Sequence, residues 1–331
     1  VIGQFRFFEG GTAMITHIIR KILAAIPILI VVSLILFFLM NILPGDAASG
    51  IANIDAGEEY INKLREEMGL NRPFLVRYAD WVKSMLTGDF GKSLINGQPV
   101  REKIALRLPV TLEITFLAMV VSLLIALPAG IISAIRRNSP LDMAGSILSM
   151  IGVAMPPFWL GMLLILVFSV NLRWLPASGF VSFFESPLEN LSRMIMPAFA
   201  IGAAFAATVM RQTRSALLEV LDQDYIVTAK AKGLKGSVII WKHALRNSLI
   251  PVITVIAMQV GRMIGGVVVC ETVFAMPGIG REIVDSILSR DYPVAMGLIM
   301  SVAIIVVFIN TFIDVVYVII DPRISHNSTA G

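Results

Sequence analysis

Six long apolar runs alternate with polar segments along the chain. A helix needs about 20 mostly apolar residues to cross a bilayer core roughly 30 Å thick. Only a helix can satisfy all the backbone polar groups of an isolated segment in lipid, so the runs are predicted to be helices. The fourth run is the least regular, because it is short, rich in Ala and Gly, and interrupted by Pro197. The pattern predicts an all-α integral membrane protein with six transmembrane helices, at residues 22–42, 110–135, 146–170, 194–210, 249–273 and 294–320.

The composition supports this class. Hydrophobic residues make up 56% of the chain and charged residues 15%, with a mean hydropathy of +0.82. A typical soluble domain has about 45–50% apolar residues and about 25% charged residues. The lone Cys270 excludes an intramolecular disulfide and a metal site with several Cys ligands. The net charge of +4 comes from Lys and Arg in the loops and does not indicate nucleic acid binding.

Lys and Arg are distributed unevenly between alternate loops, which predicts the orientation of the chain in the membrane. The short loops on one side carry only Arg173, Arg193, Arg281 and Arg290. The segments that we assign to the cytoplasm carry Arg20, Lys21, Arg136, Arg137, Arg211, Arg214, Lys230, Lys232, Lys235, Lys242, Arg246 and Arg323. Both termini are therefore expected to be cytoplasmic.

The runs and loops divide the chain into segments. Residues 1–13 are expected to be an over-called start, because Glu9-Gly10-Gly11 before Met14 is what a translated ribosome-binding site would give. The other expected segments are the first helix with its N-terminal segment (14–42), an extracytoplasmic helical loop (43–109), the membrane core (110–321) with a polar loop at 211–248, and a cytoplasmic tail (322–331).

In the extracytoplasmic loop, four residues share one face of a predicted helix: Phe74, Tyr78, Trp81 and Met85. They either pack against the outer ends of the spans or contact a protein that delivers the substrate.

Two short motifs resemble nucleotide sites without meeting their requirements. Gly-Lys-Ser at 91–93 follows Gly88 after two residues, whereas a phosphate loop needs four residues between its glycines. Asp89-Phe90-Gly91 lacks every other kinase element. The histidines (His17, His243 and His326) form no His-Glu-x-x-His pair. The sequence thus predicts no catalytic, cofactor or metal site in this chain.

The polar loop at 211–248 carries the strongest functional pattern. Residues 225–232 form a short predicted helix that ends at Gly233, which suits a left-handed cap. Small alanines and charged lysines fit either an ordinary basic loop or a compact helix that docks in a partner's groove. The predicted docking residues are Asp224, Tyr225, Thr228, Ala229, Lys230, Ala231, Lys232 and Gly233.

Ionisable residues within or at the ends of the predicted spans are the other candidate functional residues. A mid-span Arg such as Arg262 costs about 2.5–3.5 kcal/mol on insertion scales, so it should face a wet cavity or the bundle interior. It either lines a pathway and meets a substrate carboxylate, or pairs with Asp314 or backbone carbonyls. The predicted pathway residues are Arg262, Met258 and Asp314, and Glu271 lies nearer the outer end of its span.

The loop after the fifth run contains a tight turn signal, with Pro-Gly followed by a second Gly. The candidate extracytoplasmic residues there are Phe274, Pro277, Gly278 and Gly280.

Many short motifs follow one another in a fixed order. They are Leu43-Pro44-Gly45-Asp46, Gly88-Asp89-Phe90-Gly91 with Ser93, Met155-Pro156-Pro157-Phe158, Thr213-Arg214-Ser215, Asp224-Tyr225, Ala229-Lys230-Ala231-Lys232-Gly233, His243-Ala244-Leu245-Arg246-Asn247, Phe274 with Pro277-Gly278-Ile279-Gly280, Arg290-Asp291-Tyr292-Pro293 and Asp321-Pro322-Arg323. From Met14 to Arg323 the chain resembles the B-type permease subunits of dipeptide, oligopeptide, nickel and glutathione ABC importers. Its polar loop is similar to their EAA loop. Val227 and Thr228 replace the Glu and first Ala of the general motif, and His243-Ala244-Leu245-Arg246 replaces Ile-x-Leu-Pro, as is typical of the peptide/nickel branch.

The resemblance implies a type I ABC importer permease fold in the cytoplasmic membrane of a prokaryote. It implies a homologous second permease, two cytoplasmic ATPases that hold ATP and Mg, and an extracellular or periplasmic substrate-binding protein. The helix at 225–233 would be the coupling helix, through which the ATPases drive alternating access. Peptides are the expected substrates, with a nickel chelate or glutathione as alternatives. A stand-alone secondary transporter, with ion coupling through Arg262, Glu271 or Asp314, stays open, whereas a membrane enzyme is disfavoured.

Overall fold

The computed structural model describes the backbone of residues 5–42, 48, 57–67 and 69–320, and the side chains of 21, 23–42, 48, 57–67 and 69–313. In this part of the chain every regular element is a helix, apart from one isolated bridge between Lys92 and Pro99. The residues form two compact units, one built mainly from Leu112–Met276 and the other from His17–Thr111 with Pro277–Phe308. The fold class predicted from the apolar pattern is confirmed.

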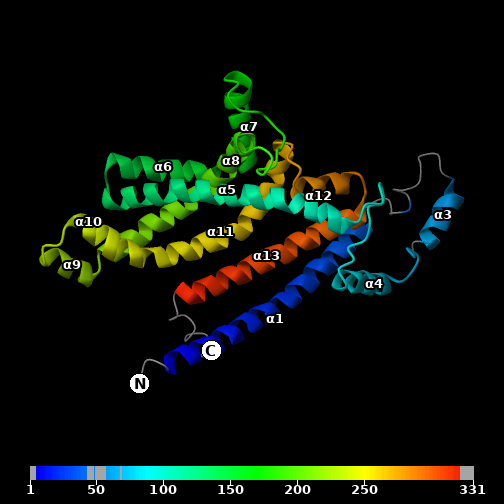
Figure 1. Cartoon of the computed structure of the whole chain (residues 1–331), viewed down its shortest axis with the longest axis horizontal. Helices are drawn as coiled ribbons and strands as arrows, with labels where there is room; N and C mark the ends of the chain where they lie inside the picture. The colour runs from blue at the N-terminus through cyan, green and yellow to red at the C-terminus, as the bar shows by residue number, and fades with distance from the viewer. Residues whose placement is uncertain (1–4, 43–47, 49–56, 68, 321–331) are drawn as a thin grey trace. The chain divides into compact units, whose positions relative to one another are not determined.

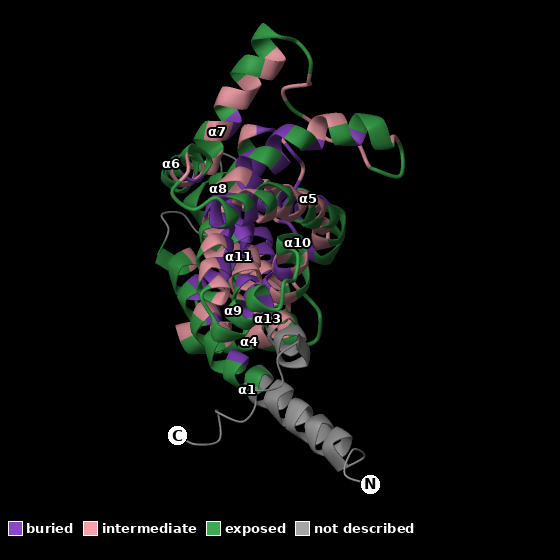
Figure 2. Ribbon diagram, turned by 90° about the vertical axis from the view of Figure 1, so that its left-hand side faces the viewer, coloured by how far each residue is buried: buried purple, intermediate pink, exposed green. Residues whose placement is uncertain are grey.

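The Leu112–Met276 unit is a bundle in which α8 and α11 pack along each other (Figure 1). Its elements are most of α5 (Val100–Ile135), α6 (Pro140–Ala154), α7 (Pro157–Leu164), the π-helical η1 (Ile165–Asn171), α8 (Pro187–Leu221), α9 (Asp224–Ala231), α10 (Gly236–Val238), the π-helical η2 (Ile239–Ala244) and α11 (Leu245–Val273). Buried residues gather along α8 and α11 (Figure 2). Small residues permit the close packing: a Cβ added to Gly202 of α8 would lie 2.6 Å from the carbonyl oxygen of Ala118 in α5.

Five helices among the described residues are long and apolar enough to cross a membrane, or six if one bent pair counts as a single span. The pair is α6 and α7–η1, whose axes turn by 103°. The pattern predicted one continuous run at 146–170, and this detail is wrong. The helix stops because the ring of Pro156 disfavours helical dihedrals at the preceding residue, and Met155 is accordingly extended (φ −88, ψ 117).

The fourth span is longer than its apolar run at 194–210 predicted. Helix α8 covers Pro187–Leu221 and contains Pro197 within it. It extends beyond the apolar run at both ends, and about three further turns, at residues 211–221, lie between that run and α9.

The second unit contains α3 (Glu58–Glu67), α4 (Phe74–Leu86), the first turns of α5, α12 (Ile279–Leu288), and most of α1 (Phe5–Ile42) and α13 (Tyr292–Ile320). The ring of Phe37 in α1 lies 5.2–5.6 Å from those of Phe74, Tyr78 and Trp81, and Ser33 shares a 2.8 Å hydrogen bond with the Tyr78 hydroxyl. The aromatic face predicted for α4 thus packs on the first span, which agrees with packing against the spans, the first of the two interpretations given for this face.

The Gly-Asp-Phe-Gly-Lys-Ser segment is a structural turn. The Ser93 hydroxyl donates to the buried carboxylate of Asp291 at 2.5 Å, and the Leu94 N–H donates to its other oxygen at 3.0 Å. Gly91 has φ +84, a value that favours glycine. These residues sit beside a small core formed by Val100, Ile279, Val294 and Leu298.

Candidate functional site

Helix α9 begins at Asp224, after Gln223 in an extended conformation, and ends at Ala231. Gly233 follows with φ +76. Its N–H donates to the Lys230 carbonyl at 3.0 Å, and the Leu234 N–H donates to the Ala229 carbonyl at 3.3 Å. This pair of bonds is the Schellman cap, so the predicted left-handed termination at Gly233 is confirmed.

One face of α9 is anchored in the bundle. Ile226 and Ala229 are buried, one turn apart, in a cluster with Ile131, Leu217 and Ile239. Ala229 was predicted to dock on a partner, but the structure places it on this inner face, where its small side chain lets α9 lie close to the bundle. The other predicted docking residues are exposed: Asp224, Tyr225, Thr228, Lys230, Ala231, Lys232 and Gly233.

Polar bonds tie α9 to its neighbour and stiffen it. The Asn247 amide of α11 donates to the Tyr225 hydroxyl at 2.9 Å, and the Thr228 hydroxyl donates to the Asp224 carbonyl at 2.9 Å. The helix is thus connected to α11 through Asn247 and to α8 through Leu217 of the apolar cluster.

A buried ion pair lies close to this loop, and sequence reasoning missed it. Arg214 of α8 donates to both carboxylate oxygens of Asp142 in α6, from Nε at 2.7 Å and from Nη2 at 2.8 Å. Ser133 of α5 and the Asn138 N–H, at 2.9 Å, donate to the same carboxylate, which is 4% exposed. The helix start at Ser139-Pro140 could have been recognised from the sequence. The pairing of Asp142 with Arg214 could not, because the two residues are 72 positions apart.

Arg262 of α11 lines a cavity of about 310 Å³ next to the bend at Met155–Pro156. The other polar side chains on this cavity are Thr208 of α8 and Gln259 of α11, and the remaining lining residues are Val153, Ala154, Met155, Pro156, Pro157, Ala204 and Phe205. Gln259 is only 4% exposed, and sequence reasoning did not single it out.

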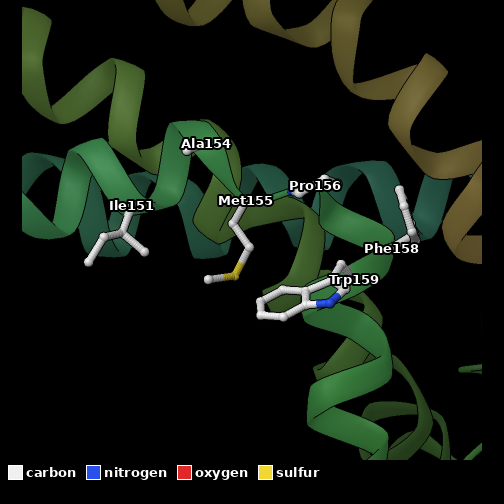
Figure 3. Close-up of a pocket in the computed structure, with 6 residues that line it drawn as sticks. All are labelled: Ile151, Ala154, Met155, Pro156, Phe158 and Trp159. Atoms are coloured by element: carbon white, nitrogen blue, oxygen red, sulfur yellow. The ribbon is translucent and has the colours of Figure 1, made fainter.

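The other predicted pathway residues do not join this cavity. Met258 is 61% exposed and is not among its lining residues, and the side chain of Asp314 lies outside the described residues. A second, apolar hollow of about 440 Å³ lies at the same bend. Figure 3 shows the side chains of Met155 and Trp159, which line this hollow, extending toward the same space beside the bend.

The residues predicted for the outer turn are mostly buried anchors. Phe274 packs its ring against Gly161, and its carbonyl accepts the Gly179 N–H at 3.0 Å. The left-handed residue of the turn is Ala275 (φ 50). In the other unit, Gly278 and Gly280 are buried and Pro277 is half-buried, at the start of α12.

Glu282 of α12 is the centre of a charge cluster in the second unit. Lys103 Nζ lies 2.7 Å and Arg107 Nη2 2.9 Å from its carboxylate oxygens. Burial alone would raise the pKa of Glu282, but the Lys103 hydrogen bond and the two positive charges outweigh it and lower the pKa below its usual value.

A family model described as "binding-protein-dependent transport system inner membrane component" matches residues 126–326, and the model of its N-terminal part matches residues 14–115. The chain belongs to this family. Membership implies that this permease works with a substrate-binding protein and an ATPase, and is a multi-span protein of a bacterial membrane.

Curated relatives align over almost the whole chain. A putative peptide transport system permease protein of Brucella suis is 39% identical over 314 residues, oligopeptide transport system permease protein AppB of Bacillus subtilis is 40% identical over 316 residues, and glutathione transport system permease protein GsiC of Salmonella choleraesuis is 38% identical over 313 residues. Each alignment covers 95% of this chain and 100% of the relative.

A solved chain of the MetNI methionine ABC transporter superposes with a TM-score of 0.55 at 18% identity, covering 66% of this permease and 96% of that chain. This likeness shows the type I importer permease fold.

Proposed function

We propose that this permease forms, with a homologous second permease, the membrane pathway of an ATP-driven importer of peptides. The curated relatives support peptides as cargo, since two of those named above are peptide permeases. Glutathione, named for the third, is itself a peptide and falls within the same class. Both termini would lie in the cytoplasm, following the distribution of Lys and Arg.

The observation that carries the mechanism is the shape of α9. It is a short, capped helix with one face fixed to the bundle by Ile226 and Ala229 and with an exposed opposite face that bears Asp224, Thr228 and Ala231. Such a helix can sit in a groove of a cytoplasmic ATPase and move with it. ATP and Mg would bind on two such ATPases, and their closure would push α9 against α8 and α11, which are the central helices of the bundle.

The bistable element in this proposal is the bundle, and ATP and the loaded binding protein would each favour one arrangement of it. The permease itself would perform no covalent chemistry. Its contribution is to convert the motion of the docked ATPases into alternating exposure of the pathway.

The test is cross-linking and ATPase activity of the complete importer in lipid nanodiscs. A Thr228→Cys variant, exposed on α9, should cross-link to a cysteine in the groove of the co-expressed ATPase. A Lys83→Cys variant on α4, also exposed, is the matched control and should not. Loaded binding protein should stimulate ATP hydrolysis with peptides as ligands. A permease that forms no complex with an ATPase and moves substrate alone would overturn the proposal.

A further inference from the structure

We propose that the Arg262 cavity binds the C-terminal carboxylate of the transported peptide. Arg262 would hold the carboxylate and Gln259 and Thr208 would hold the adjoining peptide group. This inference rests on the proposed importer function and adds a substrate-binding site within the chain.

The three polar side chains on the cavity lack partners in the described structure. Among the described residues, no hydrogen bond or ion pair involves the side chain of Arg262, Gln259 or Thr208. Buried side-chain amides are normally hydrogen-bonded. Gln259 is only 4% exposed as a residue, and its unpartnered amide is not fully enclosed but reaches the cavity. A polar group with this degree of burial and an open cavity beside it is suited to a ligand.

The position of Arg262 along α11 also supports a ligand site. It lies 11 residues before the end of α11 at Val273, about 16 Å at 1.5 Å per residue. This is roughly half of a bilayer core about 30 Å thick. A charged side chain at that depth should face a water-filled cavity or a counter-charge, and it marks substrate pathways in membrane proteins.

The geometry of the walls suits an anion. Gln259 and Arg262 are three positions apart on α11, so they project from neighbouring places on one helix face. Opposite them, the chain is broken at Met155–Pro156, and Pro156 and Pro157 at the start of α7 line the cavity. Neither proline has a backbone N–H, so the hydrogen-bond donors on this cavity are the side chains of Arg262, Gln259 and Thr208.

The residue types and the volume match a peptide terminus. A guanidinium offers two parallel N–H donors to a carboxylate, while the Gln amide and the Thr hydroxyl can each donate and accept. A volume of about 310 Å³ is at the lower end of ligand pockets, which measure roughly 300–1,000 Å³. It accommodates the end of a peptide, so the rest of a longer substrate would extend outside the cavity.

The experiment compares peptides with a free and an amidated C-terminus. The assembled importer in proteoliposomes is supplied with a free-acid peptide or its C-terminal amide, and uptake is scaled by the measured affinity of the binding protein for each. The Arg262→Gln variant should lower uptake of the free acid by about tenfold or more, the factor for one charge-assisted hydrogen bond. Uptake of the amide should be the same in the variant and the parent. Gln259→Leu should lower both, because it removes bonds to the peptide group.

The matched control is Arg173→Gln, which removes one positive charge from an exposed position after η1 and should leave both peptides unaffected. Equal loss of both peptides in Arg262→Gln, together with loss of basal ATPase activity, would show that Arg262 meets a carboxylate of the assembly itself and would overturn the proposal. Unchanged uptake of both peptides would overturn it as well. If the parent importer moves no peptide, the proposed function fails. If the parent moves peptide and Arg262→Gln has no effect on uptake, only the carboxylate site is refuted.

Discussion

Arg214 of α8 and Asp142 of α6 form a two-pronged ion pair, with N–O distances of 2.7 and 2.8 Å. The carboxylate is almost completely buried, while the Arg214 side chain is 29% exposed. The pair joins the start of α6 to the part of α8 that continues toward α9, so it stabilises the end of the bundle that carries α9.

We predict that Arg214→Ala destabilises this permease more than Asp142→Asn does. Loss of Arg214 leaves a buried carboxylate without its counter-charge, a change that costs about 3 kcal/mol, reduced to the extent that water screens the exposed part of the pair. Loss of the Asp142 charge leaves an arginine that can reach water. Thermal unfolding in nanodiscs measures both. Arg211→Ala, one turn earlier and exposed, is the control, and an equal effect of Arg211→Ala would contradict this role of the pair.

Gly233→Pro should uncouple ATP hydrolysis from uptake while the complex still assembles. Proline cannot adopt the φ of +76 at this position and removes the N–H that bonds to the Lys230 carbonyl. Gly233→Ala should give a partial effect, because left-handed backbone costs a residue with a Cβ roughly 1–2 kcal/mol although a Cβ has open space there.

The readout for Gly233 is the ratio of uptake to ATP hydrolysis in proteoliposomes. Gly236→Ala serves as control, since a Cβ there also has open space and φ is not positive. Normal coupling in Gly233→Pro would refute the mechanical role of the cap.

The charge cluster around Glu282 predicts a pH dependence of stability. A carboxyl with a lowered pKa in the folded state contributes stability that is complete above its unfolded pKa, near the ordinary 4.5, and is lost as pH falls through the folded value. The stability difference between the parent and Glu282→Gln should therefore be constant above about pH 5 and shrink below pH 4.5. Glu219→Gln, at an exposed position of α8, should show no such difference. A difference that grows on acidification would contradict the assignment.

Ser93→Ala should loosen the turn that precedes α5. The substitution removes the hydroxyl that donates to the buried Asp291 carboxylate, and a hydrogen bond to a charged group contributes about 1.5–3 kcal/mol. Trypsin cleavage after the exposed Lys92 should become faster, and Ser93→Thr should restore resistance by retaining the hydroxyl. Ser84→Ala, exposed on α4, is the control. Unchanged cleavage in Ser93→Ala would show that the Leu94 N–H alone holds the turn.

Several features of this permease could be predicted from neighbouring residues alone. The end of α9 at Gly233 was predictable because the cap depends on one residue that tolerates positive φ and on bonds within the same turn. The aromatic face of α4 was predictable because helical spacing places Phe74, Tyr78 and Trp81 together, although Phe37 as their partner was not.

Ala229 shows where local reasoning ends. Its small side chain is compatible with a docking surface or with close packing, and only its burial beside Ile226 decides for packing. The same applies to Arg262: its cost in a membrane identifies it as functional or paired, but its place on a cavity with Gln259 and Thr208 depends on how α8 and α11 pack.

The sequence by itself determined the membrane class, the positions of most spans, the short helix at 225–232 with its cap at Gly233, and the family, because each depends on local composition, local dihedral preferences or motif order. Only the tertiary structure decided the 103° turn between α6 and α7–η1, the pairing of Asp142 with Arg214 and of Ser93 with Asp291, and the residues that share the Arg262 cavity. These relationships join positions far apart in the chain, and they are set by which helix faces pack together, which no local pattern specifies.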